Sequence, residues 1–275
     1  MAVTWTLAEG RTLELGVRAR IMGILNVTPD SFSDGGLHDG TERAVLHARK
    51  MIAQGADIID VGGESTRPGA APVSAEEERA RVVPIIEALA GEGVPISIDT
   101  YRAETARAAL EAGAHVVNDV TGLRGDTDMA RVIATTGAGL VAMHNSRLHD
   151  PLEDPFEDQR RIYEEIGNRA DMCGIHPSQM VFDPGIGFGK DADENWTLLS
   201  RLETIVEWGM PVLLGASRKR FLGALTGREA PERDDATAAT SVVGRLAGAH
   251  VFRVHDVQRT RDALLVADEV RGRST

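Results

Sequence analysis

The chain has 275 residues, of which 42% are hydrophobic, so it can bury a sizeable core and is not expected to be disordered. Its formal net charge of −12 argues against general binding to nucleic acids or anionic membranes, although a local basic cluster can still hold a small anion. The single cysteine, Cys173, excludes an internal disulfide bond and a cysteine-based metal site.

The N-terminal residues lack the basic segment and the long apolar segment of a signal peptide. No apolar run in the chain reaches the roughly 18 residues that a membrane span needs. We therefore expect a soluble, cytoplasmic protein. Apolar and polar residues alternate weakly over residues 3–20, around a Glu-Gly-Arg turn. This alternation predicts a β-hairpin within residues 1–19 that covers the bottom of the structure that follows.

From residue 20 onward, a short apolar strand that ends in polar residues or glycine is repeatedly followed by an amphipathic helix. The expected strands are 20–26, 57–61, 95–99, 115–118, 139–143, 179–183, 211–215 and 250–254. The expected helices are about 41–54, 75–90, 103–112, 158–172, 192–208, 218–225, 234–248 and 258–272.

Eight strands and eight helices of this kind predict an α/β fold, a (β/α)8 TIM barrel over residues 20–272 preceded by the hairpin. A doubly wound sheet is the alternative, but it would normally carry a G-x-G-x-x-G fingerprint after its first strand, which this chain lacks. No linker or low-complexity segment divides the chain, so residues 1–275 are expected to form a single domain.

Polar side chains stand where nearly every expected strand ends, and active sites of barrels lie at the carboxyl ends of the strands. Any one Asp or Asn at such a position fits an ordinary helix cap equally well. For the whole set to arise in that way is improbable. The strand-end residues are Asn26, Asp60, Asp99, Asn118, Met143, His144, Asp183, Ser217, Arg218, Lys219, Arg253 and His255.

This set divides by chemistry into two groups. Asp99, Asn118 and Asp183 offer acceptors and one amide, which suit a flat ring rich in N–H donors. A second, basic group follows the last two strands, where barrels bind phosphate. It consists of Lys219, Arg253 and His255.

Asn26 ends the first strand, which neighbours the last strand in a closed barrel. One amide oxygen together with a diphosphate can hold Mg²⁺, a cation that prefers oxygen ligands and bridges phosphates. A cage of carboxylates is not visible in the sequence. The metal is therefore expected to arrive with the substrate.

Two glycine-rich loops, 62–70 and 183–190, allow the backbone to approach a ligand closely. Phe188 has few expected neighbours among these glycines, so its ring can stack on a ligand, although a plain packed turn is the alternative. The acidic stretch 150–158 is expected to be a solvated loop. Surface or structural roles are expected for His38, His47, His115, His149, His176 and His250, whose spacing matches no metal site.

Several long segments together resemble dihydropteroate synthases over essentially the whole chain. They are 22–36, 60–70, 97–100, 117–120, 183–190, 215–223 and 253–257. The resemblance implies a TIM barrel that joins 6-hydroxymethyl-7,8-dihydropterin diphosphate to p-aminobenzoate, giving 7,8-dihydropteroate and diphosphate for folate synthesis. It also implies Mg²⁺ as cofactor, small-molecule substrates, no nucleic acid or membrane partner, and a homodimer packed through late barrel helices.

By position, the resemblance implies a role for each matching residue. The pterin would contact Asp99, Asn118, Asp183, Lys219 and Met143. The diphosphate would contact Arg253, His255 and Asn26, with Mg²⁺ on Asn26. The p-aminobenzoate would contact Thr66, Arg67, Pro68, Phe32, Phe188, Ser217 and Lys219. The catalytic residues would be Lys219, Asp34, Arg67 and Asp99.

The expected mechanism is an S_N1-like displacement, with loops 27–36 and 62–70 closing to exclude water. Two features depart from the family pattern: Arg220 stands where many members have a serine, and the segment Asn145-Ser146-Arg147 is unfamiliar. No residue is inserted near Phe188, so inhibition by sulfonamides is expected. A pterin-dependent methyltransferase and a non-catalytic pterin-binding paralogue are the alternatives, and each should lack loop features that are present here.

Overall fold

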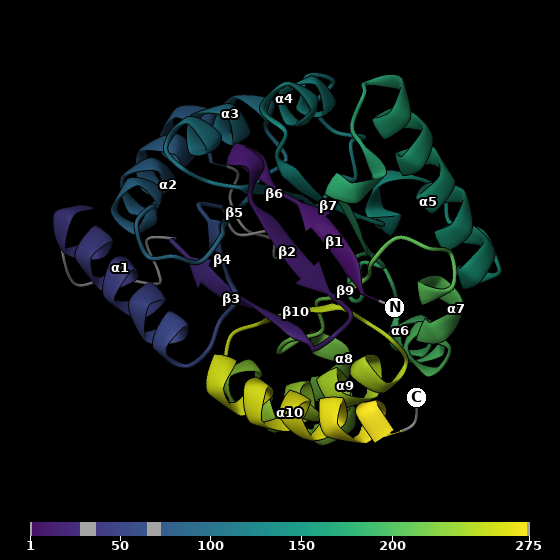
Figure 1. The fold of residues 1–275 in the computed structure, drawn as a ribbon. Helices are drawn as coiled ribbons and strands as arrows, with labels where there is room; N and C mark the ends of the chain where they lie inside the picture. Colours follow the sequence, from purple (N-terminus) through teal and green to yellow (C-terminus); the bar gives the residue numbers. More distant parts are fainter. Residues whose placement is uncertain (1, 28–36, 65–72, 274–275) are drawn as a thin grey trace.

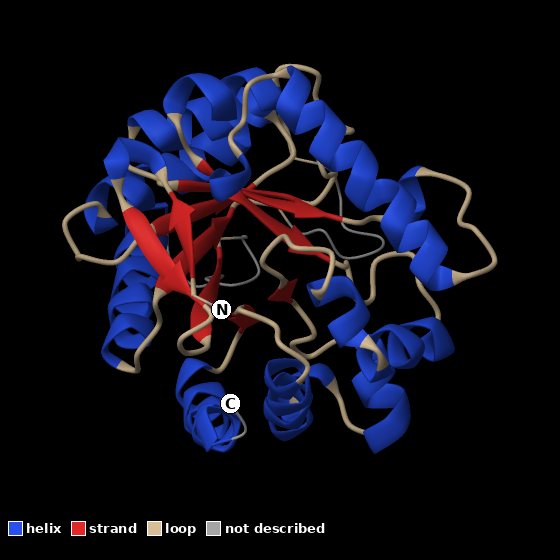
Figure 2. Cartoon of the chain, turned by 45° about the vertical axis from the view of Figure 1, so that its right-hand side comes forward, coloured by secondary structure: helices blue, strands red, loops and turns tan. Residues whose placement is uncertain are grey.

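The barrel predicted from the strand pattern is present in the computed structural model, which describes residues 2–27, 37–64 and 73–273. Within these ranges, eight parallel strands form one sheet in the order β8-β7-β6-β5-β4-β3-β10-β9. A parallel bridge between Phe182 and Val212 joins its two ends, and the Phe182 amide donates to the Pro211 carbonyl over 2.8 Å. The sheet is therefore a closed ring with helices around it (Figures 1 and 2).

The strands lie close to their predicted positions, and most begin one residue later than expected. They are β3 (Arg20–Asn26), β4 (Ile58–Gly62), β5 (Ile96–Asp99), β6 (Val116–Asp119), β7 (Gly139–Met143), β8 (Met180–Asp183), β9 (Leu213–Leu214) and β10 (Val251–Val254).

β9 is shorter than the predicted strand 211–215 for a local reason. Pro211 has no amide hydrogen, and the Val212 amide donates to Nδ1 of His250 over 3.1 Å instead of to a neighbouring strand. Leu213 and Leu214 are left to pair with Val251 and Phe252 of β10. The strand is therefore reduced to two residues, because Pro211 has no donor and the side chain of His250 takes the Val212 amide.

The helices differ from the prediction in two places. The helix α4 was not predicted, because it is only eight residues long and lacks a side-chain hydrogen bond at its N-cap. The predicted helix 192–208 is divided at Arg201 into α6 and α7. The helices are α1 (Leu37–Ala53), α2 (Ala75–Leu89), α3 (Ala103–Glu111), α4 (Met129–Thr136), α5 (Pro155–Met172), α6 (Ala192–Ser200), α7 (Leu202–Val206), α8 (Arg220–Thr226), α9 (Asp234–Leu246) and α10 (Val257–Arg273).

The predicted N-terminal hairpin closes one end of the barrel. β1 (Val3–Thr6) pairs antiparallel with β2 (Thr12–Leu15) and crosses over the barrel strands (Figure 1). Trp5, Leu7 and Leu15 are buried against the first residues of those strands. The hairpin therefore covers the amino ends of the strands, and the site must lie at the opposite, carboxyl ends.

None of the described helices is both long and apolar enough to cross a lipid bilayer. Their apolar faces instead pack on the barrel, as in α4, where Met129, Val132 and Ile133 are buried. The core thus consists of a layer between strands and helices and a smaller cluster under the hairpin.

Candidate active site

Three side chains from different strands form an ion-pair network at the carboxyl ends of the barrel. Arg253 of β10 donates through Nε to Asp60 of β4 over 2.6 Å, and through Nη2 to Asp99 of β5 over 2.6 Å. Burial opposes the charge of Arg253, but the two carboxylates raise its pKa above the usual value. The guanidinium therefore stays charged and fixes both acids across the end of the barrel.

The network leaves acceptor atoms unsatisfied. Asn118 donates to Oδ2 of Asp60 over 3.1 Å, while Oδ1 of Asp60 and Oδ1 of Asp99 are buried without a hydrogen-bond partner among the described residues. Burial raises the pKa of Asp99 to about 7, against the opposing effect of Arg253. Unpaired buried acceptors cost free energy, so this floor fits a ligand that brings N–H donors.

Asp183 and Lys219 face the same space from β8 and from the loop after β9. A Cβ atom on Gly215 would lie 3.5 Å from Oδ2 of Asp183 and 3.8 Å from Nζ of Lys219, so the glycine leaves room between them. Lys219 donates to the Ile186 carbonyl and lies 4.6 Å from the centroid of the Phe188 ring. Burial lowers the pKa of Lys219 to about 8, although Asp183 opposes this.

Four further predicted residues line the same end of the barrel. Oγ of Ser217 lies 2.9 Å from Nδ1 of His255 and accepts the His255 amide over 3.2 Å, which ties the loop after β9 to the end of β10. Oδ1 of Asn26 and Oδ2 of Asp99 would each lie 3.8 Å from a Cβ atom on Gly62, so both flank that glycine. Met143 is buried at the end of β7.

Several predicted residues lie outside the described ranges. These are Phe32 and Asp34 of the first loop, and Thr66, Arg67 and Pro68 of the second. The expected closure of loops 27–36 and 62–70 likewise falls mainly on residues outside those ranges.

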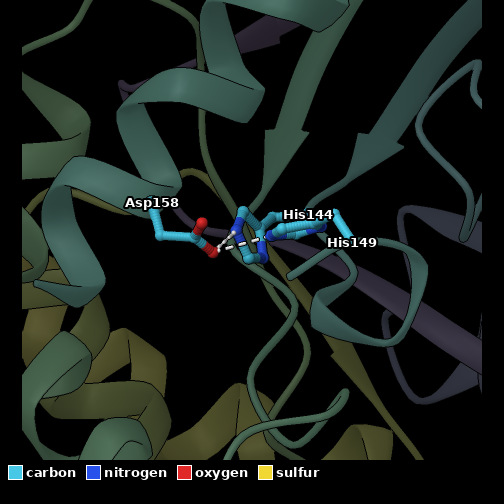
Figure 3. A group of neighbouring side chains, drawn as sticks. All are labelled: His144, His149 and Asp158. Atoms are coloured by element: carbon cyan, nitrogen blue, oxygen red, sulfur yellow. Dashed lines mark hydrogen bonds and ion pairs between the residues drawn. The ribbon is translucent and has the colours of Figure 1, made fainter. Parts of the chain in front are cut away.

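Two interpretations of the loops at this end of the barrel, after β7 and after β8, need correction. The stretch 150–158 is not a solvated loop throughout, because α5 begins at Pro155 and Asp158 is buried. Asp158 accepts hydrogen bonds from two histidines, which sequence spacing alone did not bring together (Figure 3). Phe188 also has more neighbours than expected, since Arg147 lies 5.2 Å from the centroid of its ring.

Asp60 stood at a strand end, but the sequence offered no reason to give it a role. Its role in the ion-pair network depends on Arg253, which is 193 positions away along the chain. Arg147, Asp158 and Lys190 carried no recognisable spacing motif. The pairing of β10 with β3 brings Arg253 within reach of Asp60, whereas Arg147, Asp158 and Lys190 lie in segments that follow the neighbouring strands β7 and β8.

Comparisons with known proteins agree with this geometry. A family model described as "Pterin binding enzyme" matches residues 22–255. The dihydropteroate synthase of Clostridium beijerinckii is 46% identical over 260 residues, covering 94% of this chain and 96% of that protein.

Solved structures give the same result. Dihydropteroate synthase of Xanthomonas albilineans with 4-aminobenzoic acid superposes with a TM-score of 0.92 at 43% identity, covering 98% of this chain and 99% of that chain. A Yersinia pestis dihydropteroate synthase in complex with a sulfonamide drug superposes with a TM-score of 0.90 at 39% identity, covering 99% and 100%.

Proposed function

The chain belongs to the dihydropteroate synthases, a group of pterin binding enzymes, and we propose from that premise which residues carry each part of the reaction. The enzyme condenses 6-hydroxymethyl-7,8-dihydropterin diphosphate with p-aminobenzoate, and it releases 7,8-dihydropteroate and diphosphate. The unpaired buried oxygen of Asp99 is the observation that best supports the assignment, because an acceptor without a partner at the carboxyl ends of the strands suits the ring N–H groups of a pterin.

In this proposal, Asp99, Asn118 and Asp183 bind the pterin ring. Their oxygens accept its N–H groups, the amide of Asn118 completes the pattern, and Met143 provides an apolar wall. Lys219 lies at the edge of the ring, between Asp183 and Phe188. Asp60 does not contact the substrate in this proposal. It accepts hydrogen bonds from Asn118 and Arg253 and so holds both in place.

Arg253, His255 and Asn26 bind the diphosphate in this proposal. Oδ1 of Asn26, which flanks Gly62 at the carboxyl end of β3, is an oxygen ligand of the kind that a hard divalent cation prefers. Asn26 would hold Mg²⁺, which supplies positive charge to the leaving diphosphate. Arg253 contributes a charge that pH does not remove, because its pKa is raised further by its two carboxylate partners.

The proposed chemistry is an S_N1-like substitution. The C–O bond between the pterin CH₂ group and the diphosphate breaks first, and the electron-rich pterin stabilises the resulting cation. The amine nitrogen of p-aminobenzoate then forms the C–N bond and releases a proton. Such a reaction needs charge stabilisation and orientation rather than a strong base. Inversion at a stereochemically labelled CH₂ group would instead indicate a concerted displacement.

Phe188, Ser217 and Lys219 form the described part of the p-aminobenzoate site in this proposal. The Phe188 ring offers a flat apolar face, and Ser217 is held by His255. Sulfonamides, which resemble p-aminobenzoate, are proposed to compete for the same place. The roles of Phe32, Asp34, Thr66, Arg67 and Pro68 stay as the predictions stated from the family resemblance.

We also propose a single domain and a homodimer formed through the last two helices. Helices α9 and α10 lie side by side on the outside of the barrel (Figure 1). Large apolar side chains are exposed on both, which is typical of a surface that a partner covers. They are Val243, Leu246, Leu265, Val266 and Val270. Elution of the purified protein as a monomer at micromolar concentration would contradict the dimer.

One assay tests the site assignment. The purified enzyme is supplied with dihydropterin diphosphate and p-aminobenzoate, with and without Mg²⁺, and dihydropteroate is measured. Turnover should require Mg²⁺ and should fall at least a hundredfold in Lys219→Ala, by analogy with the loss of other transition-state donors. Arg131→Ala, at an exposed pair with Asp128, is the control and should retain full activity. Normal turnover of Lys219→Ala would refute the assignment.

A further inference from the structure

The loop after β9 contains Arg218, a residue at a predicted strand end to which the proposed reaction gives no role. It stands between Ser217 and Lys219, whose side chains both face the site. The Arg218 side chain instead reaches α9, where it forms an ion pair with Asp234. The chain therefore presents two side chains to the site and the one between them to the layer of helices.

The backbone at Arg218 is left-handed, with a φ of +58°. Among the described residues, only Glu9 and Leu123 share a positive φ without being glycine, and Glu9 lies in the hairpin at the opposite end of the barrel. A Cβ atom disfavours this conformation, so it persists only where surrounding contacts hold it. Residues strained in this way are concentrated at active sites, so the contacts that hold Arg218 bear on the site.

Contacts from α9 hold both the side chain and the backbone of Arg218. Nε donates to Oδ1 of Asp234 and Nη2 donates to Oδ2, each over 2.7 Å, which makes the pair bidentate. The Arg218 amide donates to Oγ1 of Thr237 over 3.1 Å. Nη1 of Arg233 donates to the Arg218 carbonyl over 3.1 Å. The start of α9 therefore fixes the guanidinium and both polar backbone groups of Arg218.

Asp234 binds Arg218 rather than the free amides of its own helix. An aspartate in a first turn usually stabilises that helix end, but here the guanidinium takes both carboxylate oxygens, and α9 has no side-chain hydrogen bond at its N-cap. Asp234 is buried, whereas the adjacent Asp235 is exposed. Hydrogen bonding to Asp234 raises the pKa of Arg218 above its usual value. Loss of either partner would therefore leave a charge without compensation.

The backbone of Lys219 is held by the same contacts. Lys219 is the N-cap residue of α8, which begins at Arg220, and its carbonyl accepts Nη1 of Arg233 over 3.4 Å. A Cβ atom on Gly223 of α8 would lie 2.3 Å from Cζ of Arg233, so the glycine makes room for that guanidinium. From this backbone position the ammonium reaches the Ile186 carbonyl. The start of α9 thus sets where Lys219 leaves the chain.

We propose that Arg218 and Asp234 are positioning residues of the reaction: their ion pair holds the left-handed turn that directs Lys219 into the site. Neither side chain touches the substrate. The inference rests on the proposed role of Lys219 at the edge of the pterin ring. It places the control of that residue in α9, outside the barrel.

The first test measures dihydropteroate formation in Arg218→Ala, in Asp234→Ala and in the double variant. Each single variant should lower kcat by between about tenfold and about a hundredfold, since a displacement of about 1 Å can cost about a hundredfold in rate. The double variant should be no worse than Arg218→Ala, because the two residues act as one pair. Asp235→Ala removes the adjacent exposed aspartate and is the matched control, with no expected change. Turnover at the wild-type rate in either single variant would overturn the proposal.

The second test separates positioning from a contribution to stability alone. In the background of Lys219→Ala, adding Arg218→Ala should change turnover by less than about twofold, since no ammonium is left to position. The fall in Tm that Arg218→Ala causes should persist in that background. If turnover instead fell there as steeply as it does when Lys219 is present, the pair would not act through Lys219, and its positioning role would be overturned.

Arg218→Gly provides the same information if Arg218→Ala does not fold. Glycine adopts a positive φ without strain, so this variant should unfold at a higher temperature than Arg218→Ala. Its turnover should still be low, because the ion pair is missing, and recovery to the wild-type rate would overturn the role of the pair. If the wild-type protein formed no dihydropteroate at all, the proposed function would fail instead, so the two failures are distinguishable.

Discussion

Arg253 and Asp99 form an ion pair of 2.6 Å although they are 154 positions apart in the chain. The barrel makes this contact possible, because β10 lies beside β3, β3 beside β4 and β4 beside β5. The guanidinium reaches from the last strand across two others, and it meets Asp60 on the way. Two carboxylates thus share one cation in the floor of the site.

Removal of that cation should destabilise the protein in a way that depends on pH. Arg253→Met leaves Asp60 and Asp99 buried without a counter-ion, which should cost about 3 kcal/mol of unfolding free energy at pH 8. At pH 5 the loss should be smaller, because Asp99, whose pKa is raised, then takes up a proton. Urea unfolding at both pH values measures this. Arg259→Met, at an exposed pair with Asp235, should change stability by less than about 0.5 kcal/mol. A loss of equal size at both pH values would contradict the account.

The raised pKa of Asp99 predicts that replacing its carboxyl group stabilises the protein, although pterin binding is lost. This pKa is about 7 in the folded protein, compared with about 3.9 when unfolded. Between these values the folded state binds the extra proton, so stability attributable to Asp99 is lost as pH rises from about 4 to 7. Asp99→Asn cannot ionise, so its Tm should exceed that of wild type by a margin that grows up to about pH 7 and then levels off. It should lose pterin binding, and a margin independent of pH would refute the pKa assignment.

The lowered pKa of Lys219 predicts the alkaline side of the pH profile. Its folded pKa is about 8, below the usual value of about 10.4, so its charge destabilises the folded state below pH 8 and the protein gains stability between about pH 8 and 10. Activity should fall over the same range as the ammonium deprotonates. Lys219→Arg, whose charge persists, should have low activity but no fall above pH 8. A fall that persisted in this variant would assign the titration to another group.

The fold was predictable from sequence because each strand is short, apolar and followed by a polar residue. Met129, Val132 and Ile133 of α4 form one apolar face, but eight residues give too little pattern to recognise a helix. The positions of Asp99, Asn118 and Asp183 at the carboxyl end of the barrel were predictable for the same reason, since they follow from the strand ends.

The contacts between side chains were not predictable in this way. Asp158 ends a stretch rich in acidic residues and so resembles a solvated residue, yet it is buried and pairs with two histidines from the preceding segment. The spacing of these histidines from Asp158 along the chain matches no known motif. The Ser146 amide likewise donates to the carbonyl of Phe188, which lies about forty residues further on. Such pairs depend on how loops meet in space, and no local pattern records that.

A substitution at Gly185 tests how closely the loop after β8 packs on the segment after β7. Gly185 should tolerate no side chain. Its φ of +65° is unfavourable for other residues, and a Cβ atom there would lie 1.8 Å from the His144 carbonyl oxygen. Gly185→Ala should therefore lower the unfolding free energy by more than about 2 kcal/mol. Gly91→Ala is the matched control, since a Cβ atom there meets nothing within 4 Å. Equal Tm values for the two variants would mean that the loops separate easily.

Sulfonamides should inhibit this enzyme in competition with p-aminobenzoate. The Phe188 loop carries no inserted residue, and Lys219 and Arg147 bound the ring on which the inhibitor would pack. Rising sulfanilamide should increase the apparent KM for p-aminobenzoate in proportion, while kcat stays constant. Inhibition that lowers kcat would show that the two compounds do not share one site.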